Sequence, residues 1–283
     1  MSTSASEMAD KQDQKSGDDS VNVQAGGNVS FGMSYSETKD LAQVVARQEA
    51  RVEMERRMQE IADAVYYRLQ KEKPAEARAA VSSPDFQLAL FDAQKGYART
   101  GDATLRDMLL NLLINRVGAD DRPLVHAVLA EALVTAPKLL PRHFDLLTAI
   151  FVFRHSKMND ITSREQLRAF LARFLVPFID DWPASDPTFE YLQYTGCGSV
   201  SAIEATTARL MRETYPQPFP GPIDDNDVNS FLESVNPKMV AFVNSWNKSL
   251  ASRFVMTAVG KAIAHANFER RTRSHADLNS WVN

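Results

Sequence analysis

Residues 21–35 alternate apolar and polar side chains in a way that constrains the rest of the chain. The alternation is typical of a half-buried β-strand, and Gly26-Gly27 interrupts it where a tight turn would lie. Glycine adopts the positive φ that a primed hairpin turn requires, and the following Asn28 tolerates it. The segment therefore predicts a β-hairpin of two strands, each of about five residues.

A lone two-stranded hairpin is marginally stable in water, and its edges carry unpaired backbone N–H and C=O groups. No other stretch of the sequence has the pattern of a partner strand. We therefore expect the hairpin to pair with another copy of itself, which makes the chain a homo-oligomer. The alternative is a hairpin folded back onto its own helical domain. The residues expected to join the copies are Val21, Val23, Gln24, Ala25, Gly26, Gly27, Val29, Phe31 and Met33.

A long helix is expected after the hairpin. The sequence from about Glu37 to Lys73 contains neither proline nor glycine, and we place the helix start at Ser36. A heptad repeat does not continue through the segment, so a connecting helix is favoured over a regular coiled coil. The second half carries the clearer apolar stripe, formed by Met54, Met58, Ile61, Ala62, Val65 and Leu69.

The remainder shows repeated helix-start signals, including Ser83, Asp102, Ser163 and Ser201. The predicted fold class is mainly α, a multi-helix, bundle-like body preceded by the long helix and the N-terminal β-hairpin. The expected organisation is a disordered acidic tail (1–20), the hairpin (21–35), the long helix (36–73), a helical domain (74–214), a proline-rich connection (215–225) and a C-terminal helical segment packed on the body (226–283).

Composition narrows the class of protein. A formal net charge of −4 argues against a general binder of nucleic acid or anionic membranes, because such proteins are usually basic. A single cysteine fits a reducing compartment. The N-terminus lacks the apolar core of a signal peptide, and the apolar windows are too short to span a bilayer. We therefore expect a cytoplasmic protein with no membrane span.

Several segments resemble an uncharacterised bacterial family that has no assigned activity. Its members begin with a segment similar to Asn-x-Gln-Ala-Gly-x-Asn-Val, here residues 22–29, and continue as an all-helical body. The resemblance continues through 196–197, 257–264 and 278–282, and it implies an accessory or defence role. A shorter resemblance, at 23–26, is to the Val-Gln-x-Gly core of amyloid-forming signalling motifs, with Ala25 in place of a larger aliphatic residue.

Candidate chemical sites are few, and no motif for nucleotide binding, zinc binding or serine hydrolysis is present. Cys197, between two glycines, is the candidate nucleophile, but its sequence surroundings favour a structural thiol. Asp224, Asp225 and Asp227 lack the glycine and glutamate of a calcium loop. We therefore predict no catalytic residue, no cofactor and no metal. Gly260 lies within a predicted helix and indicates close helix packing.

Three functions remain open at this point. The first is a non-enzymatic interaction or assembly protein, such as a sensor or adaptor in a defence or stress system, with an unknown protein partner. The second is an enzyme with an unrecognised site around Cys197. The third is a nucleic-acid-associated factor that uses Arg270, Arg271 and Arg273, although nucleic acid is the less favoured partner for this acidic chain.

Overall fold

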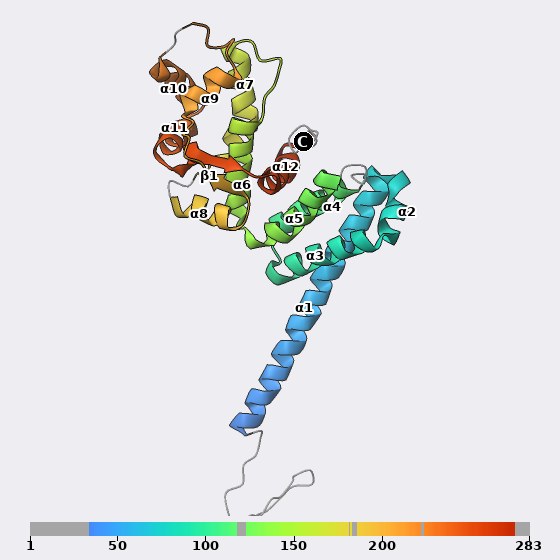
Figure 1. Ribbon diagram of the computed structural model, residues 1–283. Helices are drawn as coiled ribbons and strands as arrows, with labels where there is room; N and C mark the ends of the chain where they lie inside the picture. Colours follow the sequence, from blue (N-terminus) through green and yellow to red (C-terminus); the bar gives the residue numbers. More distant parts are fainter. Residues whose placement is uncertain (1–33, 118–122, 181, 183–185, 222–223, 275–283) are drawn as a thin grey trace, which may run out of the picture. The chain divides into compact units, whose positions relative to one another are not determined.

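The computed structural model describes residues 34–117, 123–180, 182, 186–221 and 224–274. Within these ranges the chain is mainly helical, as the fold-class prediction stated (Figure 1). The chain divides into two compact units, residues 1–50 and residues 51–283. Residues 21–33 of the predicted hairpin, with every residue expected to join copies, lie outside the described residues.

Short connections separate the helices and strands of the described chain. The helices are α1 (Tyr35–Glu72), α2 (Pro74–Ser82), α3 (Pro84–Thr100), α4 (Ala103–Arg116), α5 (Pro123–Thr135), α6 (Pro141–Ile150), α7 (Arg164–Phe174), α8 (Asp186–Tyr194), α9 (Thr207–Thr214), α10 (Asp225–Glu233), α11 (Lys238–Lys248) and α12 (Ala258–Thr272), and the strands are β1 (Gly198–Val200) and β2 (Phe254–Met256).

The long helix α1 begins earlier than the sequence analysis placed it. Ser34 and Glu37 form a capping box: the Ser34 N–H donates to the Glu37 carboxylate at 2.8 Å, and the Glu37 N–H donates to the Ser34 hydroxyl at 3.3 Å. The predictions that Ser36 starts the helix and that Tyr35 ends a strand were therefore wrong. Tyr35 is the first helical residue, because the box satisfies the backbone N–H groups of Ser34 and Glu37 directly before and within the first turn.

The second half of α1 packs through its apolar stripe, as predicted for most of its members. Ile61, Ala62, Val65 and Leu69 are buried, whereas Met54 is 46% exposed. Two start signals in the body are also confirmed: Asp102 accepts the Leu105 N–H at 2.7 Å, and Ser163 forms a capping box that opens α7.

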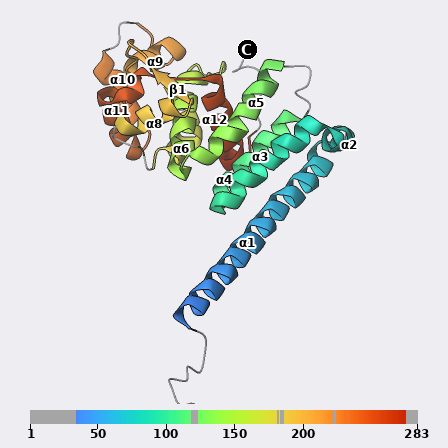
Figure 2. The same ribbon diagram turned by 60° about the horizontal axis from the view of Figure 1, so that its bottom comes forward.

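Helix α12 lies in the middle of the larger unit. It packs against α4, α5 and α6, and it lies between α6 and the α4–α5 pair in both views (Figures 1 and 2). Its central residues are buried without interruption from Ala262 to Asn267. The C-terminal helix is therefore a core element of this unit, although it is the last described helix of the sequence.

A small antiparallel sheet was not predicted from the sequence. β1 pairs with β2, with Gly198 opposite Met256 and Val200 opposite Phe254. The helix predicted to start at Ser201 was also wrong, since α9 begins at Thr207. Its first residues instead continue the sheet contact: the Ser201 N–H donates to Arg253 O at 2.8 Å, and the Ala205 N–H donates to Ser252 O at 2.9 Å.

The close approach predicted at Gly260 is confirmed, but its neighbour is a loop and not a helix. A Cβ built on Gly260 lies 1.9 Å from the carbonyl oxygen of Cys197. The same oxygen accepts a hydrogen bond from the Thr257 N–H at 3.1 Å. The start of α12 therefore rests directly on the backbone that leads into β1, and this approach leaves no room for a side chain.

We predict that Gly260→Ala destabilises the fold by about 1–3 kcal/mol or more, because the methyl group overlaps backbone that cannot rotate away. At an exposed position inside a helix, the same change raises the free energy of unfolding by about 1 kcal/mol. A fall in the free energy of unfolding therefore distinguishes a closely packed Gly260 from an exposed one. Urea unfolding followed by circular dichroism measures it. An unchanged or raised free energy of unfolding contradicts the close approach.

Candidate functional site

Cys197 has the environment of a structural thiol. The residue is 0% exposed, and the Thr195 hydroxyl lies 3.5 Å from its sulfur. Burial raises the pKa of the Cys197 thiol, which disfavours the thiolate that a nucleophile needs. No imidazole or carboxylate of the described residues forms a hydrogen bond with the sulfur. The geometry therefore gives no support to chemistry at Cys197.

The Cys197 thiol should react slowly with an aromatic disulfide reagent in the native state, and the rate should rise steeply once denaturant unfolds the chain. Cys197→Ser should keep the fold, because the serine hydroxyl can replace the sulfur beside Thr195, with a loss of stability of about 1 kcal/mol. Native reactivity equal to that of free cysteine is the result that contradicts this description.

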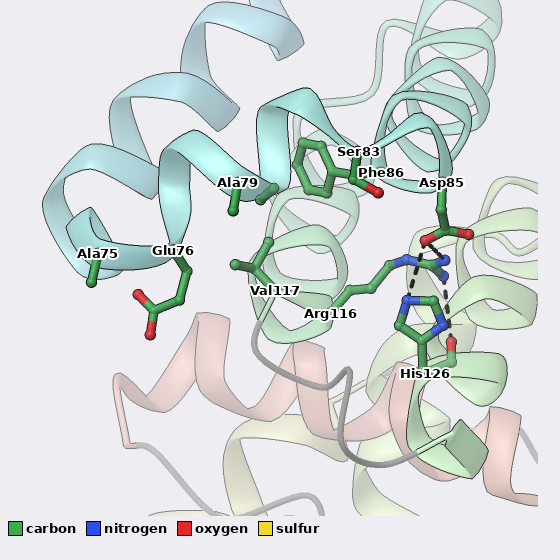
Figure 3. Close-up of a pocket in the computed structure, with 10 residues that line it drawn as sticks. Ala75, Glu76, Ala79, Ser83, Asp85, Phe86, Arg116, Val117 and His126 are labelled. Atoms are coloured by element: carbon green, nitrogen blue, oxygen red, sulfur yellow. Dashed lines mark hydrogen bonds and ion pairs between the residues drawn. The ribbon is translucent and has the colours of Figure 1, made fainter.

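A cavity of about 310 Å³ lies beside α2, and its wall includes three ionisable side chains from three further helices. The Arg116 guanidinium of α4 and the His126 ring of α5 converge on the carboxylate of Asp85 in α3, while Glu76 of α2 lies apart (Figure 3). The His126 Nε2 is 3.2 Å from Asp85 Oδ2, and Arg116 also donates to the His126 carbonyl at 3.4 Å. These contacts connect α3, α4 and α5.

The electrostatics of this cavity favour a structural role. The Arg116 side chain is 5% exposed, so its charge requires a partner, and the Asp85 carboxylate supplies one. The hydrogen bond from Arg116 lowers the pKa of Asp85. Asp85 neutralises the guanidinium, and Glu76 adds a second negative charge to the wall. The cavity therefore favours neither an anion nor a particular reaction.

The buried position of Arg116 was not predicted from the sequence. Its partners Asp85 and His126 are 31 and 10 positions away along the chain, so no short motif marks the cluster. A sequence also does not distinguish a buried arginine from an exposed one, because the apolar stem of the side chain is compatible with either position on an amphipathic helix. The signal that could have found it is weak: Arg116 ends a strongly apolar helix.

Asp85→Asn should destabilise the fold by about 1–3 kcal/mol at neutral pH, since it leaves the buried Arg116 charge without its carboxylate. We expect a smaller loss of stability than for a fully buried ion pair, because the Asp85 side chain is 58% exposed. A lowered pKa means that the wild-type stabilisation is present above the unfolded pKa of about 3.9 and is lost as pH falls through the folded pKa.

The difference between wild type and Asp85→Asn should therefore shrink on acidification. Chemical denaturation at neutral pH and at about pH 3 measures it. The matched control is Asp92→Asn, which removes an exposed ion pair with Lys95 and should change stability by less than about 1 kcal/mol. Equal losses in both variants contradict the special role of Asp85.

The C-terminal arginines are largely engaged inside the fold. Arg271 donates to the Asp145 carboxylate at 2.6 Å, and its guanidinium lies 5.1 Å from the ring centre of Phe178. Arg270 donates to the side-chain oxygen of Asn267 at 2.8 Å. These two side chains therefore hold α12 in place, and the arrangement does not favour the nucleic-acid hypothesis.

The remaining candidates do not converge on a site. Within the described ranges, no group of three or more His, Cys, Asp or Glu side chains has the geometry to hold a metal ion. Asp225, one of the three aspartates considered for a calcium loop, pairs with Arg212. None of the described helices combines the length and the apolar character needed to cross a membrane.

The first half of α1 is the most unusual surface of the described chain. Every residue from 34 to 50 is exposed, and yet this stretch carries Leu41, Val44 and Val45, which are 50%, 60% and 46% exposed. Val52, 55% exposed, continues the row. We call these four side chains the exposed stripe of α1.

The exposed stripe lies on a different side of the helix from the buried one. At 3.6 residues per turn, its mean direction is roughly a third of a turn away from that of Ile61, Val65 and Leu69. A helix that served only to dock on its own body would keep one apolar side along its length. The exposed stripe therefore does not continue the buried side of the same helix.

The chain belongs to an uncharacterised protein family, whose model matches residues 32–222 and residues 220–282. No curated protein and no solved structure matches the chain. The two matched ranges meet within the proline-rich connection, and the Asn-x-Gln-Ala-Gly-x-Asn-Val segment at 22–29 precedes both. Family membership therefore comes without a reaction, a ligand or a partner.

Proposed function

We propose that the chain is a non-enzymatic interaction protein that assembles copies of itself through residues 21–35 and the exposed stripe of α1. The observation that carries the proposal is the complete exposure of residues 34–50 together with their apolar row. Most helical stability in proteins comes from packing of an apolar face, so an apolar row kept on an unpacked helix is best explained by a partner that buries it.

The energetics favour burial of this stripe. Covering a leucine or valine side chain contributes about 1.5–3 kcal/mol when the burial is complete. The exposed stripe offers four such side chains, and the predicted hairpin strands, directly before them in the sequence, add an apolar face that includes Val23 and Phe31. One contact surface that runs from the hairpin into α1 would bury both sets together.

A second copy of the chain is the partner that fits best. Hairpin edges are satisfied by an identical edge, and a closed symmetric assembly leaves no edge for further growth. The division of the chain at Ala50 also separates the stretch that carries Leu41, Val44 and Val45 from the packed body. The body is then available for a different partner, and a cytoplasmic sensor or adaptor in a defence or stress system is the role we propose for it.

The central prediction concerns mass in solution. The full chain should be a homo-oligomer, and Leu41→Glu with Val45→Glu should lower its mass, because two charges are placed in the apolar row. The matched control is Ala46→Glu with Ala50→Glu, which adds the same charge to the same helix on other sides and should leave the mass unchanged. Light scattering coupled to size exclusion measures all three proteins.

Two further changes separate the hairpin from the stripe. Val23→Asp with Phe31→Asp, and the chain begun at Ser36, should each lower the copy number while the body keeps its helical circular-dichroism spectrum. A full chain that is monomeric at micromolar concentration contradicts the proposal. If Ala46→Glu with Ala50→Glu lowers the mass as much as Leu41→Glu with Val45→Glu does, the effect comes from added charge in general. That result contradicts the role of the exposed stripe of α1 as the contact surface.

A further inference from the structure

A second cavity, of about 380 Å³, is shared by the first turns of two helices. Helices α6 and α8 lie side by side in both views (Figures 1 and 2). The N-terminal end of a helix carries about half a positive charge, and its first backbone N–H groups have no partner within the helix. The described residues that line this cavity are Lys138, Leu140, Arg142, His143, Pro187, Thr188 and Tyr191.

The wall of this cavity carries two positive side chains without a carboxylate partner. Lys138 and Arg142 are exposed, and neither side chain forms a hydrogen bond or an ion pair with a described residue. None of the described lining residues is an aspartate or a glutamate. The cavity beside α2 differs, because Glu76 and Asp85 both belong to its wall.

The acidic residues of α6 and α8 do not line the cavity. Asp186 Oδ1 accepts the Leu250 N–H at 3.0 Å, and the Asp145 carboxylate accepts hydrogen bonds from α12. Glu190 is exposed and is not one of the lining residues. The cavity is therefore locally positive in a protein whose formal net charge is −4.

His143 supplies a buried hydrogen-bond donor to this wall. The residue is 3% exposed, and its Nδ1 accepts the Leu140 N–H at 3.2 Å. Burial and the charge of Arg142 lower the pKa of His143 to about 4, so at neutral pH the ring is neutral and carries its proton on Nε2. Neither this Nε2 nor the backbone N–H of Arg142 forms a hydrogen bond with a described residue.

Tyr191 supplies a flat apolar wall in a fixed orientation. Its hydroxyl donates to Lys138 O at 2.7 Å, and the centre of its ring lies 5.5 Å from that of His143. The Tyr194 ring is 6.3 Å from the Tyr191 ring, and Leu140, which is 50% exposed, lines the same cavity. A ligand that carries a ring therefore has an apolar surface beside the positive charges.

We propose that this cavity binds a small molecule that carries a phosphate group on a flat ring, with the phosphate at the two helix starts and the ring against Tyr191. Lys138 and Arg142 contribute two positive charges, and each helix start contributes about half a charge. This total suits a phosphate of charge near −2 better than a carboxylate of charge −1. The site goes beyond the proposed assembly, because it uses no residue of the exposed stripe of α1.

Isothermal titration of the full chain at low salt tests the site. The probe is phenyl phosphate, with inorganic phosphate and benzoate as comparisons, at a pH above the second phosphate pKa of about 6. We expect saturable binding of phenyl phosphate at millimolar concentration or below. It should bind more tightly than either comparison, because only phenyl phosphate combines the doubly charged group with the ring.

Lys138→Gln and Arg142→Gln should each weaken the binding of phenyl phosphate about tenfold, as expected for the loss of a charged hydrogen bond. Both side chains are exposed, so both variants should fold, and circular dichroism checks this. If one of them does not fold, the other decides. Arg78→Gln, an exposed change of equal charge on α2, is the matched control and should leave binding unchanged.

Four results overturn the proposal. The first is the absence of saturable phenyl phosphate binding at millimolar concentration. The second is binding of benzoate or inorganic phosphate as tight as that of phenyl phosphate, which removes the role of the double charge or of the ring. The third is unchanged binding in the folded variants of Lys138 and Arg142. The fourth is equal weakening by Arg78→Gln, which shows a general effect of net charge.

Discussion

The buried side-chain amide of Asn267 is the constraint on which the larger unit depends. Asn267 is 0% exposed, and its Nδ2 donates to Asp145 Oδ1 and to Thr148 Oγ1, each at 2.9 Å. Its oxygen accepts from Arg270, and Asp145 in turn accepts from Arg271. Any sliding of α12 along α6 leaves the buried polar groups of Asn267 and Thr148 without these bonds, at about 1–3 kcal/mol for each buried group left unpaired. The network therefore specifies one register, where apolar packing alone would tolerate several.

The same helix is tied to α1 through a second buried amide. Asn111 of α4 donates to Ala266 O at 2.9 Å and accepts from Arg68 of α1 at 2.6 Å. The packed half of α1 is thus held by polar contacts as well as by its apolar stripe. Residues 34–50 differ from this packed half. The second half of α1 contacts the body of its own chain, whereas the first half exposes apolar side chains to water.

Sequence patterns predicted the features that depend on hydrogen bonds between residues close together in the chain. Asp102 and Ser163 were recognised as helix starts because their bonds close within three residues. Ser201 failed as a start because its N–H bonds to Arg253 O, far along the chain, and that contact overrides the local preference. The β1–β2 pair and the buried Arg116 were not predicted for the same reason. Each depends on partners that only the folded chain brings together.

The backbone that Arg154 binds and the two buried amides are connected through α12, which raises the question of coupling between them. Arg154 binds the backbone at Ser252 and Phe254, β2 leads through Thr257 into α12, and α12 reaches α1 through Asn111. Contact along such a route does not by itself transmit a signal, because transmission needs an element with two discrete arrangements. Asn267 argues against such an element in α12, since its full set of partners is satisfied in one register. Communication with a partner would then depend on the surface rather than on movement of the core.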